Sequence, residues 1–166
     1  MFKKTQKEIQ LGMFSSPTTL LSGRSKTLYE KKDAWHNLFR KEVTMRVDEE
    51  IFKDLFCPDN GSPNASIRVL VAMMILKDAQ GISDEKLFED CRFNILIRSA
   101  LGLMNIDDQI PAVSTYYSLR KRIHEDAKAG NENRLTKVFS EITRQQSLEF
   151  NVSGKRIRMD SKLFRQ

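Results

Sequence analysis

The feature that most constrains the fold is an apolar block near the middle of the chain, residues 67–76, in which Arg68 is the only charged residue. A helix built from this block has no face polar enough to lie against water, so it must be covered on all sides. Gly81 ends the pattern, because glycine readily adopts the left-handed conformation that terminates helices. The sequence therefore predicts a buried helix over residues 65–80, around which the other elements pack.

Amphipathic segments flank this central helix on both sides. Apolar residues recur at helical spacing in five further places, which predict helices over residues 28–41, 48–56, 84–101, 115–127 and 132–149. The helix that begins at residue 84 either continues to residue 101 or breaks and restarts before Gly102. Ser83 and Ser114 stand where helix N-caps are expected. In the first segment Trp35, Leu38 and Phe39 are predicted to share the apolar face. We expect an all-α fold, a helical bundle of about six helices around the buried central helix.

The two ends of the chain differ from the helical middle, residues 28–150. Residues 1–27 show no sustained period and carry clusters of Ser, Thr, Pro and Gly, which predict an extended N-terminal arm. Over residues 156–161 apolar or small residues alternate with charged ones, the period-two pattern of a β-strand. An unpaired strand has no partner in an otherwise helical chain. The sequence therefore predicts that residues 151–166 begin another domain.

The charge balance favours a polyanionic partner. The net charge is +6 and the sequence pI is about 9.4, and a basic excess of this kind attracts nucleic acid. Five basic residues and one acid lie within residues 155–166. No apolar run approaches the length of a membrane span, and no apolar stretch of a signal peptide follows the first residues. We therefore expect a cytoplasmic protein without a membrane partner.

The sequence does not assemble a small-molecule or metal site. Cys57 and Cys91, with His36 and His124, are too far apart for the spacing of a zinc site, so the cysteines are expected to be reduced structural thiols. The scattered glycines form no nucleotide-binding loop. We expect no cofactor for this chain and no small-molecule substrate.

The segment over residues 115–127 carries the clearest sign of nucleic-acid binding. Its apolar stripe leaves hydroxyl and basic residues on the opposite side, where they can contact DNA phosphates and base edges, and a helix fits the major groove. Arg120, at the edge of the stripe, is expected to form an ion pair within the domain. A solvated charged face explains the composition equally well. The residues predicted to contact DNA are Thr115, Tyr117, Ser118, Lys121 and Arg122, with Lys155, Arg156 and Arg158 adding sequence-independent affinity.

Asp160 follows the predicted strand and precedes a serine. Enzymes that transfer phosphoryl groups with two metal ions hold a divalent ion at such a place, but they need several converging oxygen ligands. From the residues alone, Asp160 is therefore an ordinary polar residue.

A series of spaced motifs resembles the N-terminal helical domain of bacterial insertion-sequence transposases, of the DDE type with an InsH-like N-terminal region. The similarity extends in order from about residue 30 to residue 161. The motifs occupy residues 61–65, 68–77, 81–84, 98–103 and 114–120, and the pattern over residues 154–163 is similar to the first catalytic strand of the family.

The resemblance implies that residues 28–150 bind double-stranded DNA at the terminal inverted repeats of an element. It also implies that residues 151–166 begin an RNase H-like catalytic domain. Asp160 would then be the first acid of the Asp, Asp, Glu triad, a catalytic residue and a ligand of Mg²⁺ in an intact parent enzyme.

The second Asp and the Glu of that triad are missing from this sequence, so the resemblance implies a truncated transposase without strand-transfer activity of its own. The first hypothesis for its function is a DNA-binding module that recognises element ends. The alternative is a protein-interaction or oligomerisation module, pairing with a second copy or with an intact transposase, that has little DNA specificity.

Overall fold

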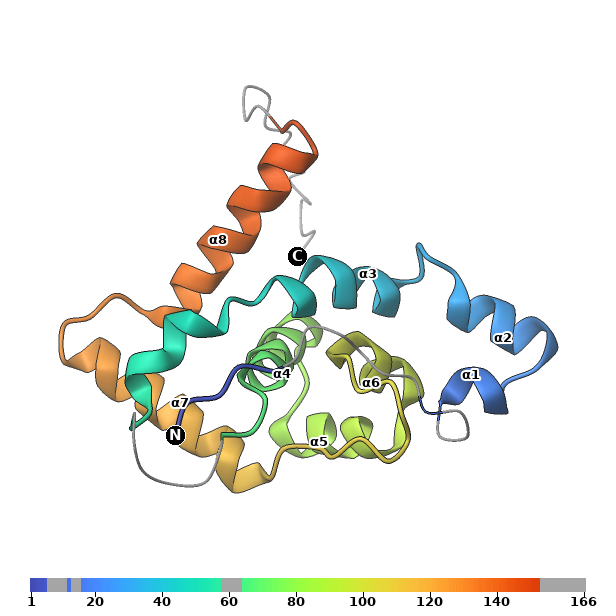
Figure 1. Ribbon diagram of the computed structural model, residues 1–166, viewed down its shortest axis with the longest axis horizontal. Helices are drawn as coiled ribbons and strands as arrows, with labels where there is room; N and C mark the ends of the chain where they lie inside the picture. The colour runs from blue at the N-terminus through green and yellow to red at the C-terminus, as the bar shows by residue number, and fades with distance from the viewer. Residues whose placement is uncertain (6–11, 13–15, 58–63, 153–166) are drawn as a thin grey trace, which may run out of the picture.

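The computed structural model describes residues 1–5, 12, 16–57 and 64–152, and within these ranges every regular element is a helix (Figure 1). The all-α prediction is therefore confirmed, with more and shorter helices than expected. The α-helices are α1 Pro17–Leu20, α2 Gly23–Glu30, α3 Trp35–Glu42, α4 Ile67–Gln80, α5 Asp84–Phe93, α6 Ile95–Leu101, α7 Val113–Lys128 and α8 Arg134–Glu149, and the 3₁₀-helices are η1 Thr44–Arg46 and η2 Glu49–Leu55.

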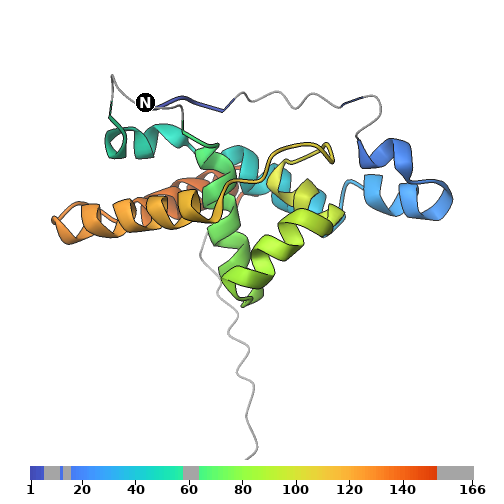
Figure 2. The same cartoon turned by 90° about the horizontal axis from the view of Figure 1, so that it is seen from below.

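The central helix is α4, and η1, η2, α5 and α6 pack against it (Figures 1 and 2). All ten residues from Ile67 to Leu76 are buried, as the apolar block predicts. The helix begins with a cap, because the Val69 N–H donates to the Ser66 hydroxyl at 3.2 Å, and it ends at Gly81 with φ of +64°. Both ends are thus set by local residues, and its burial is set by composition.

Helices α3 and α6 pack against each other beside α4, and here the predicted apolar face of α3 is wrong. Trp35 and Leu38 are 43% and 41% exposed, whereas His36 is buried. The His36 ring stacks on Tyr29 and its Nε2 lies 2.9 Å from the Tyr29 carbonyl oxygen. That hydrogen bond satisfies the Nε2 atom of His36, which allows this side chain to be buried. Compared with the predicted orientation, α3 is therefore rotated by about one residue position, with His36 facing inward in place of Trp35. Of the predicted face, Phe39 alone packs against the core.

The predicted extended arm over residues 1–27 is wrong for its second half, which forms α1 and α2. Pro17 occupies a first-turn position of α1, where the missing N–H costs nothing. Helix α2 is held by the buried Tyr29, whose carbonyl accepts hydrogen bonds from side chains of α3. In Figure 2 these two helices project from one end of the body. Only tertiary packing keeps such short helices folded.

The first five residues form no helix and lie along η2. The Thr5 hydroxyl donates to the Glu49 carboxylate at 2.7 Å, and the same carboxylate accepts the Arg68 N–H at 2.8 Å. The Phe2 ring lies 6.1 Å from that of Phe56. These contacts join the segment to the start of α4. The predicted C-terminal strand lies outside the described residues.

Two more helix boundaries are settled by the structure. Of the two alternatives for residues 84–101, the break and restart is correct: α5 and α6 are divided at Asn94, whose side chain accepts the N–H of Leu96 at 3.0 Å. Helix α7 begins at Val113, so Ser114 lies inside the first turn and makes no cap. Ala112, in an extended conformation directly after Pro111, takes the cap position.

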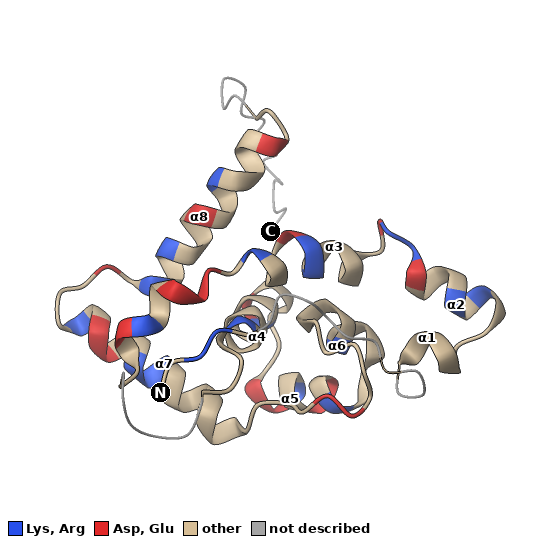
Figure 3. Ribbon diagram, in the orientation of Figure 1, with Lys and Arg blue, Asp and Glu red and all other residues tan. Residues whose placement is uncertain are grey.

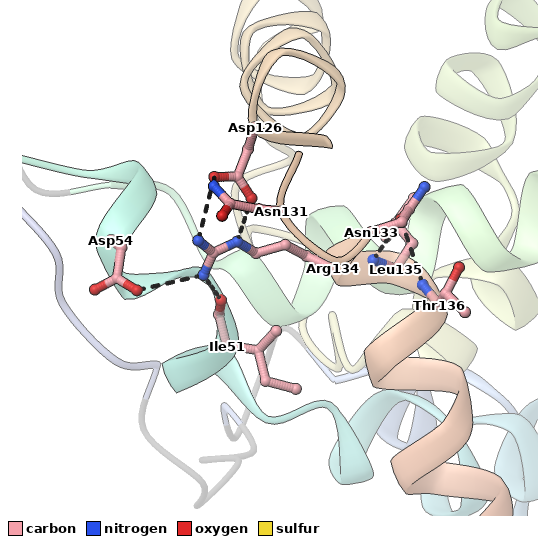
Figure 4. Close-up of polar contacts among 8 residues, drawn as sticks. All are labelled: Ile51, Asp54, Asp126, Asn131, Asn133, Arg134, Leu135 and Thr136. Atoms are coloured by element: carbon pink, nitrogen blue, oxygen red, sulfur yellow. Dashed lines mark hydrogen bonds and ion pairs between the residues drawn. The ribbon is translucent and has the colours of Figure 1, made fainter. Parts of the chain in front are cut away.

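Helix α8 is attached to the body near both of its ends. At its start the Arg134 guanidinium lies between α7 and η2 (Figure 4). Near its end Gln146 donates to the Glu42 carbonyl at 3.0 Å, and Arg46 pairs with Glu149 at 2.5 Å. Between these points only Val138 and Ile142 are fully buried.

Candidate nucleic-acid interface

Helix α7 lies at the edge of the bundle with one side against the core (Figure 1). Tyr116, Leu119 and Ile123 are buried on that side. The Tyr116 ring meets Phe88 of α5 edge-on at 5.5 Å, and burial raises the pKa of Tyr116 to about 12. The apolar stripe predicted from spacing is therefore confirmed, and it fixes which residues of α7 face outward.

The outward side of α7 exposes most of the residues that were predicted to contact DNA. Ser118, Lys121 and Arg122 are exposed, and Thr115 is half-buried. Lys121 lies 3.7 Å from Glu125, one turn away, in a pair that is open to solvent on both sides. Such a surface pair is weak and exchanges easily for a phosphate.

Arg122 is less free than its sequence position predicts. Its guanidinium lies over the Phe56 ring, 5.0 Å from the centroid, and donates to the Leu55 carbonyl at 3.3 Å. Phe56 also meets Phe2, so three segments converge on one ring. Arg122 therefore anchors η2 on α7 as well as adding charge to the face.

Tyr117 is also engaged, by an acid 33 residues earlier in the chain. Its hydroxyl donates to Asp84 Oδ2 at 2.8 Å, Arg120 lies 3.2 Å from the same oxygen, and Lys77 lies 3.2 Å from Oδ1. The ion pair predicted for Arg120 is thus confirmed. Burial of Asp84 acts to raise its pKa, but Tyr117, Lys77 and Arg120 together outweigh burial and hold that pKa below the ordinary value.

The Asp84 cluster predicts how stability responds to acid. Asp84→Asn should lower the free energy of unfolding at pH 7 by about 1–2 kcal/mol, because Lys77 and Arg120 lose their counter-charge. The contribution of a carboxylate with a depressed pKa is present above its unfolded pKa and is lost as pH falls through its folded pKa. The difference in free energy of unfolding between wild type and Asp84→Asn, measured by urea unfolding, should therefore disappear below about pH 4.

The matched control for this experiment is Glu85→Gln. Glu85 shares the first turn of α5 with Asp84 but is exposed and has no ion pair among the described residues. Both substitutions weaken the interaction of an acid with the helix dipole. The difference between their losses of stability therefore measures the contacts of Asp84 with Tyr117, Lys77 and Arg120. Equal stability of wild type and Asp84→Asn at pH 7 would contradict the assignment.

One basic residue on the exposed face of α7 was missed by the sequence analysis. Helix α7 continues one residue beyond its predicted end, to Lys128. This lysine is exposed, and it forms no ion pair within the described part of the chain. Its signal in the sequence is the seven-residue spacing from Lys121, which places both on one side of a helix.

The remaining predicted site residues cannot be placed. Lys155, Arg156, Arg158 and Asp160 lie outside the described residues, so their proposed roles remain predictions. Among the residues that are described, no three His, Cys, Asp or Glu side chains gather as a metal site would require. Cys91 is buried, and its burial raises the pKa of the thiol to about 12, as expected for a structural cysteine. Within the same residues no helix has the length and apolarity needed to cross a membrane.

Comparisons with known proteins bear on more than half of the chain. A family model described as Transposase domain (DUF772) matches residues 27–122. The match contains α3 to α6 and the first ten residues of α7, with all five residues of α7 that were predicted to contact DNA. Neither the curated proteins nor the solved structures gave a match.

Proposed function

Because the chain belongs to the Transposase domain (DUF772) family, we propose that it is a DNA-binding part of a transposase that recognises element ends through the exposed face of α7. The supporting observation is the asymmetry of this helix. One narrow stripe is buried, and the opposite face is open over the whole length of the helix, with hydroxyls near its start and lysines towards its end.

The chemistry of this face suits a duplex. Lys121 and Lys128 can neutralise phosphates, and Ser114 and Ser118 can donate to phosphate oxygens or base edges. A helix of 16 residues is about 24 Å long and about 10–12 Å wide, which matches the width of the major groove. The acid on this face, Glu125, lies beside Lys121 and would lose its partner to a phosphate.

Fluorescence anisotropy with labelled duplexes tests this function. One duplex carries the terminal repeat of the element that flanks the gene, and the other carries the same bases in scrambled order. Lys121→Gln combined with Lys128→Gln should weaken binding to the repeat roughly 10-fold near physiological salt and reduce the slope of log K against log salt by about 2, since two phosphate contacts are lost. Arg122 is left unchanged because it also supports the fold.

The matched control removes the same charge from another helix. Lys86→Gln with Arg92→Gln alters two exposed residues of α5 and should leave the preference for the terminal repeat intact. If both double variants weaken binding equally, the effect is one of overall charge, and α7 is not the contact surface. If wild type binds neither duplex, the proposed function fails.

A second candidate function is self-association, favoured by apolar side chains left uncovered on the far side of the bundle. Leu28, Trp35 and Phe93 are exposed, and they line a groove of about 820 Å³ between α2, α3 and α5. Exposed apolar clusters of this kind mark interaction surfaces. Sedimentation at increasing protein concentration distinguishes the two functions, because dimerisation that persists in the lysine variant and is lost on Phe93→Ser favours this one.

For Asp160 the proposal is that of a first catalytic acid and Mg²⁺ ligand in a DDE enzyme. It is supported by the resemblance of residues 154–163 to the first catalytic strand.

A further inference from the structure

Most partly buried arginines of this domain have their charge compensated inside the protein. Arg46 pairs with Glu42 and Glu149, and Arg134 pairs with Asp126 at 2.8 Å. A guanidinium removed from water needs such partners, because burying an unpaired charge is costly. Arg40 on α3 departs from this pattern.

Arg40 is half-buried and has no carboxylate partner among the residues that the structure describes. Its three contacts all use Nη1, which lies 2.8 Å from the Ser99 hydroxyl, 3.4 Å from the Ser99 carbonyl oxygen and 3.0 Å from the Met104 sulfur. Nε and Nη2 make no hydrogen bond within the described chain. Burial lowers the pKa of Arg40 from its ordinary value, as expected for a cation that lacks a counter-charge.

A second polar group without a partner lies beside it. Tyr29 is 5% exposed, and its hydroxyl is buried without a hydrogen-bond partner in the described structure. Tyr29 and Arg40 line one pocket of about 710 Å³ between α2 and α3, with Met104 and Leu38 as apolar walls. Buried polar groups are normally satisfied. A buried hydroxyl without a partner, in the same pocket as a guanidinium edge that makes no hydrogen bond within the described chain, therefore indicates a place for a ligand.

We propose that this pocket binds a phosphate group, held by the free edge of the Arg40 guanidinium and by the Tyr29 hydroxyl. A guanidinium offers two parallel N–H donors that match a pair of phosphate oxygens, and the phenol can donate to a third oxygen.

The charges around the pocket agree with an anionic ligand. Lys32 lies at its mouth and has no ion pair in the described part of the chain. Glu30 and Asp33 also line it, but Lys26 lies 4.0 Å from Glu30 and Lys31 lies 3.2 Å from Asp33. Positive charge therefore remains in excess where the ligand would enter.

The bound phosphate group could belong to a DNA backbone or to a free phosphate, because the same donors would bind both. The first source rests on the proposed function, and the second does not. Helices α3 and α7 lie on opposite sides of α4 (Figures 1 and 2), so the pocket can be tested without changing the face of α7.

The first arm of the test measures thermal unfolding with and without inorganic phosphate, at constant ionic strength set with chloride. Phosphate near ten times its dissociation constant should raise the Tm of wild type by about 2–4 °C more than that of Arg40→Gln or Tyr29→Phe. Phosphate also stabilises proteins without binding to a site, and that effect is common to all variants. Without phosphate, Tyr29→Phe should melt no lower than wild type, because it removes a hydroxyl that has no partner.

The second arm measures binding of the terminal-repeat duplex. If the source is DNA, Arg40→Gln should weaken binding several-fold and reduce the salt slope by about 1, and Tyr29→Phe should weaken it without changing the slope. Arg24→Gln, an exposed arginine of α2, is the matched control and should have a smaller effect than Arg40→Gln.

The outcomes separate the two proposals. A phosphate-dependent Tm difference with unchanged DNA binding supports the site and assigns it to a free phosphate. Equal phosphate response and equal DNA binding in wild type, Arg40→Gln and Tyr29→Phe overturn the site, even if α7 binds DNA as proposed. If the chain binds no duplex, the proposed function fails, and the phosphate arm still decides this inference.

Discussion

Replacing Arg98 by methionine should lower the free energy of unfolding by about 3–5 kcal/mol, a large fraction of the stability of a typical domain. Arg98 is 4% exposed and donates only to backbone carbonyl oxygens. Nη1 bonds to Cys91 at 3.0 Å, and Nη2 bonds to Asn105, Ile106 and Asp108 at 2.7, 3.1 and 3.0 Å. Methionine fills similar space but leaves these carbonyls without a donor, each at a cost of about 1–3 kcal/mol.

Urea unfolding followed by circular dichroism measures this loss. The control is Arg92→Met, which changes an exposed arginine of α5 and should cost little. Arg98→Lys should recover only part of the stability, because a single ammonium group cannot reach both the Cys91 carbonyl and the carbonyls of residues 105–108. A loss below 1 kcal/mol for Arg98→Met would show that water replaces the guanidinium.

The second large effect is expected at Arg134, which joins three elements (Figure 4). Its side chain is 16% exposed and bonds to Asp126 of α7 and to the Ile51 carbonyl of η2, with Asp54 at 3.5 Å. Arg134→Met should therefore lower the free energy of unfolding by about 2–3 kcal/mol, because Asp126 and the carbonyl lose a charged donor. Chemical denaturation at pH 7 provides the measurement.

Arg144→Met is the matched control on the same helix. Arg144 is 63% exposed and lies 2.7 Å from Glu141. Its hydrogen bond, with that of Gln145, lowers the pKa of Glu141 to about 2, yet solvent screens the pair and its removal should change stability little. If the two variants lose equal stability, the network around Arg134 contributes no more than a surface pair.

The parts of the fold that were predicted correctly depend on neighbours in the sequence. Helix α4 follows from a ten-residue block that is apolar apart from Arg68, and the cap at Ser83 follows from residue type and position. The stripe of α7 follows from helical spacing, and so does the position of Arg120 at its edge, although the partner of Arg120, Asp84, is not local. Each of these predicted features is a local property, so a single sequence is sufficient.

The parts that were wrong depend on distant contacts. Helices α1 and α2 were missed because their order comes from Tyr29 packing on His36, and His36 itself has the composition of a surface residue. In the candidate site, Tyr117 and Arg122 were predicted to be free, but their partners Asp84 and Phe56 are more than thirty residues away. No local pattern reveals such pairs.

The burial of arginines was also invisible in the sequence. Arg40 lies among polar neighbours and Arg98 among apolar ones, and neither was singled out. Arg98 donates to four backbone carbonyls through both Nη atoms, whereas Arg40 uses Nη1 alone within the described chain, a difference that only the packed structure reveals. For Arg98 the small and apolar residues that follow it were the one available signal.

Helix α8 is fixed by ion pairs near both of its ends, and Val138 and Ile142 pack into the core between them. Its 16 residues separate its first and last Cα by about 22 Å. Arg134 joins its start to α7, and Glu149 joins its end to Arg46. Helix α8 therefore sets the distance between the end of α7, where Asp126 lies, and η1, where Arg46 lies.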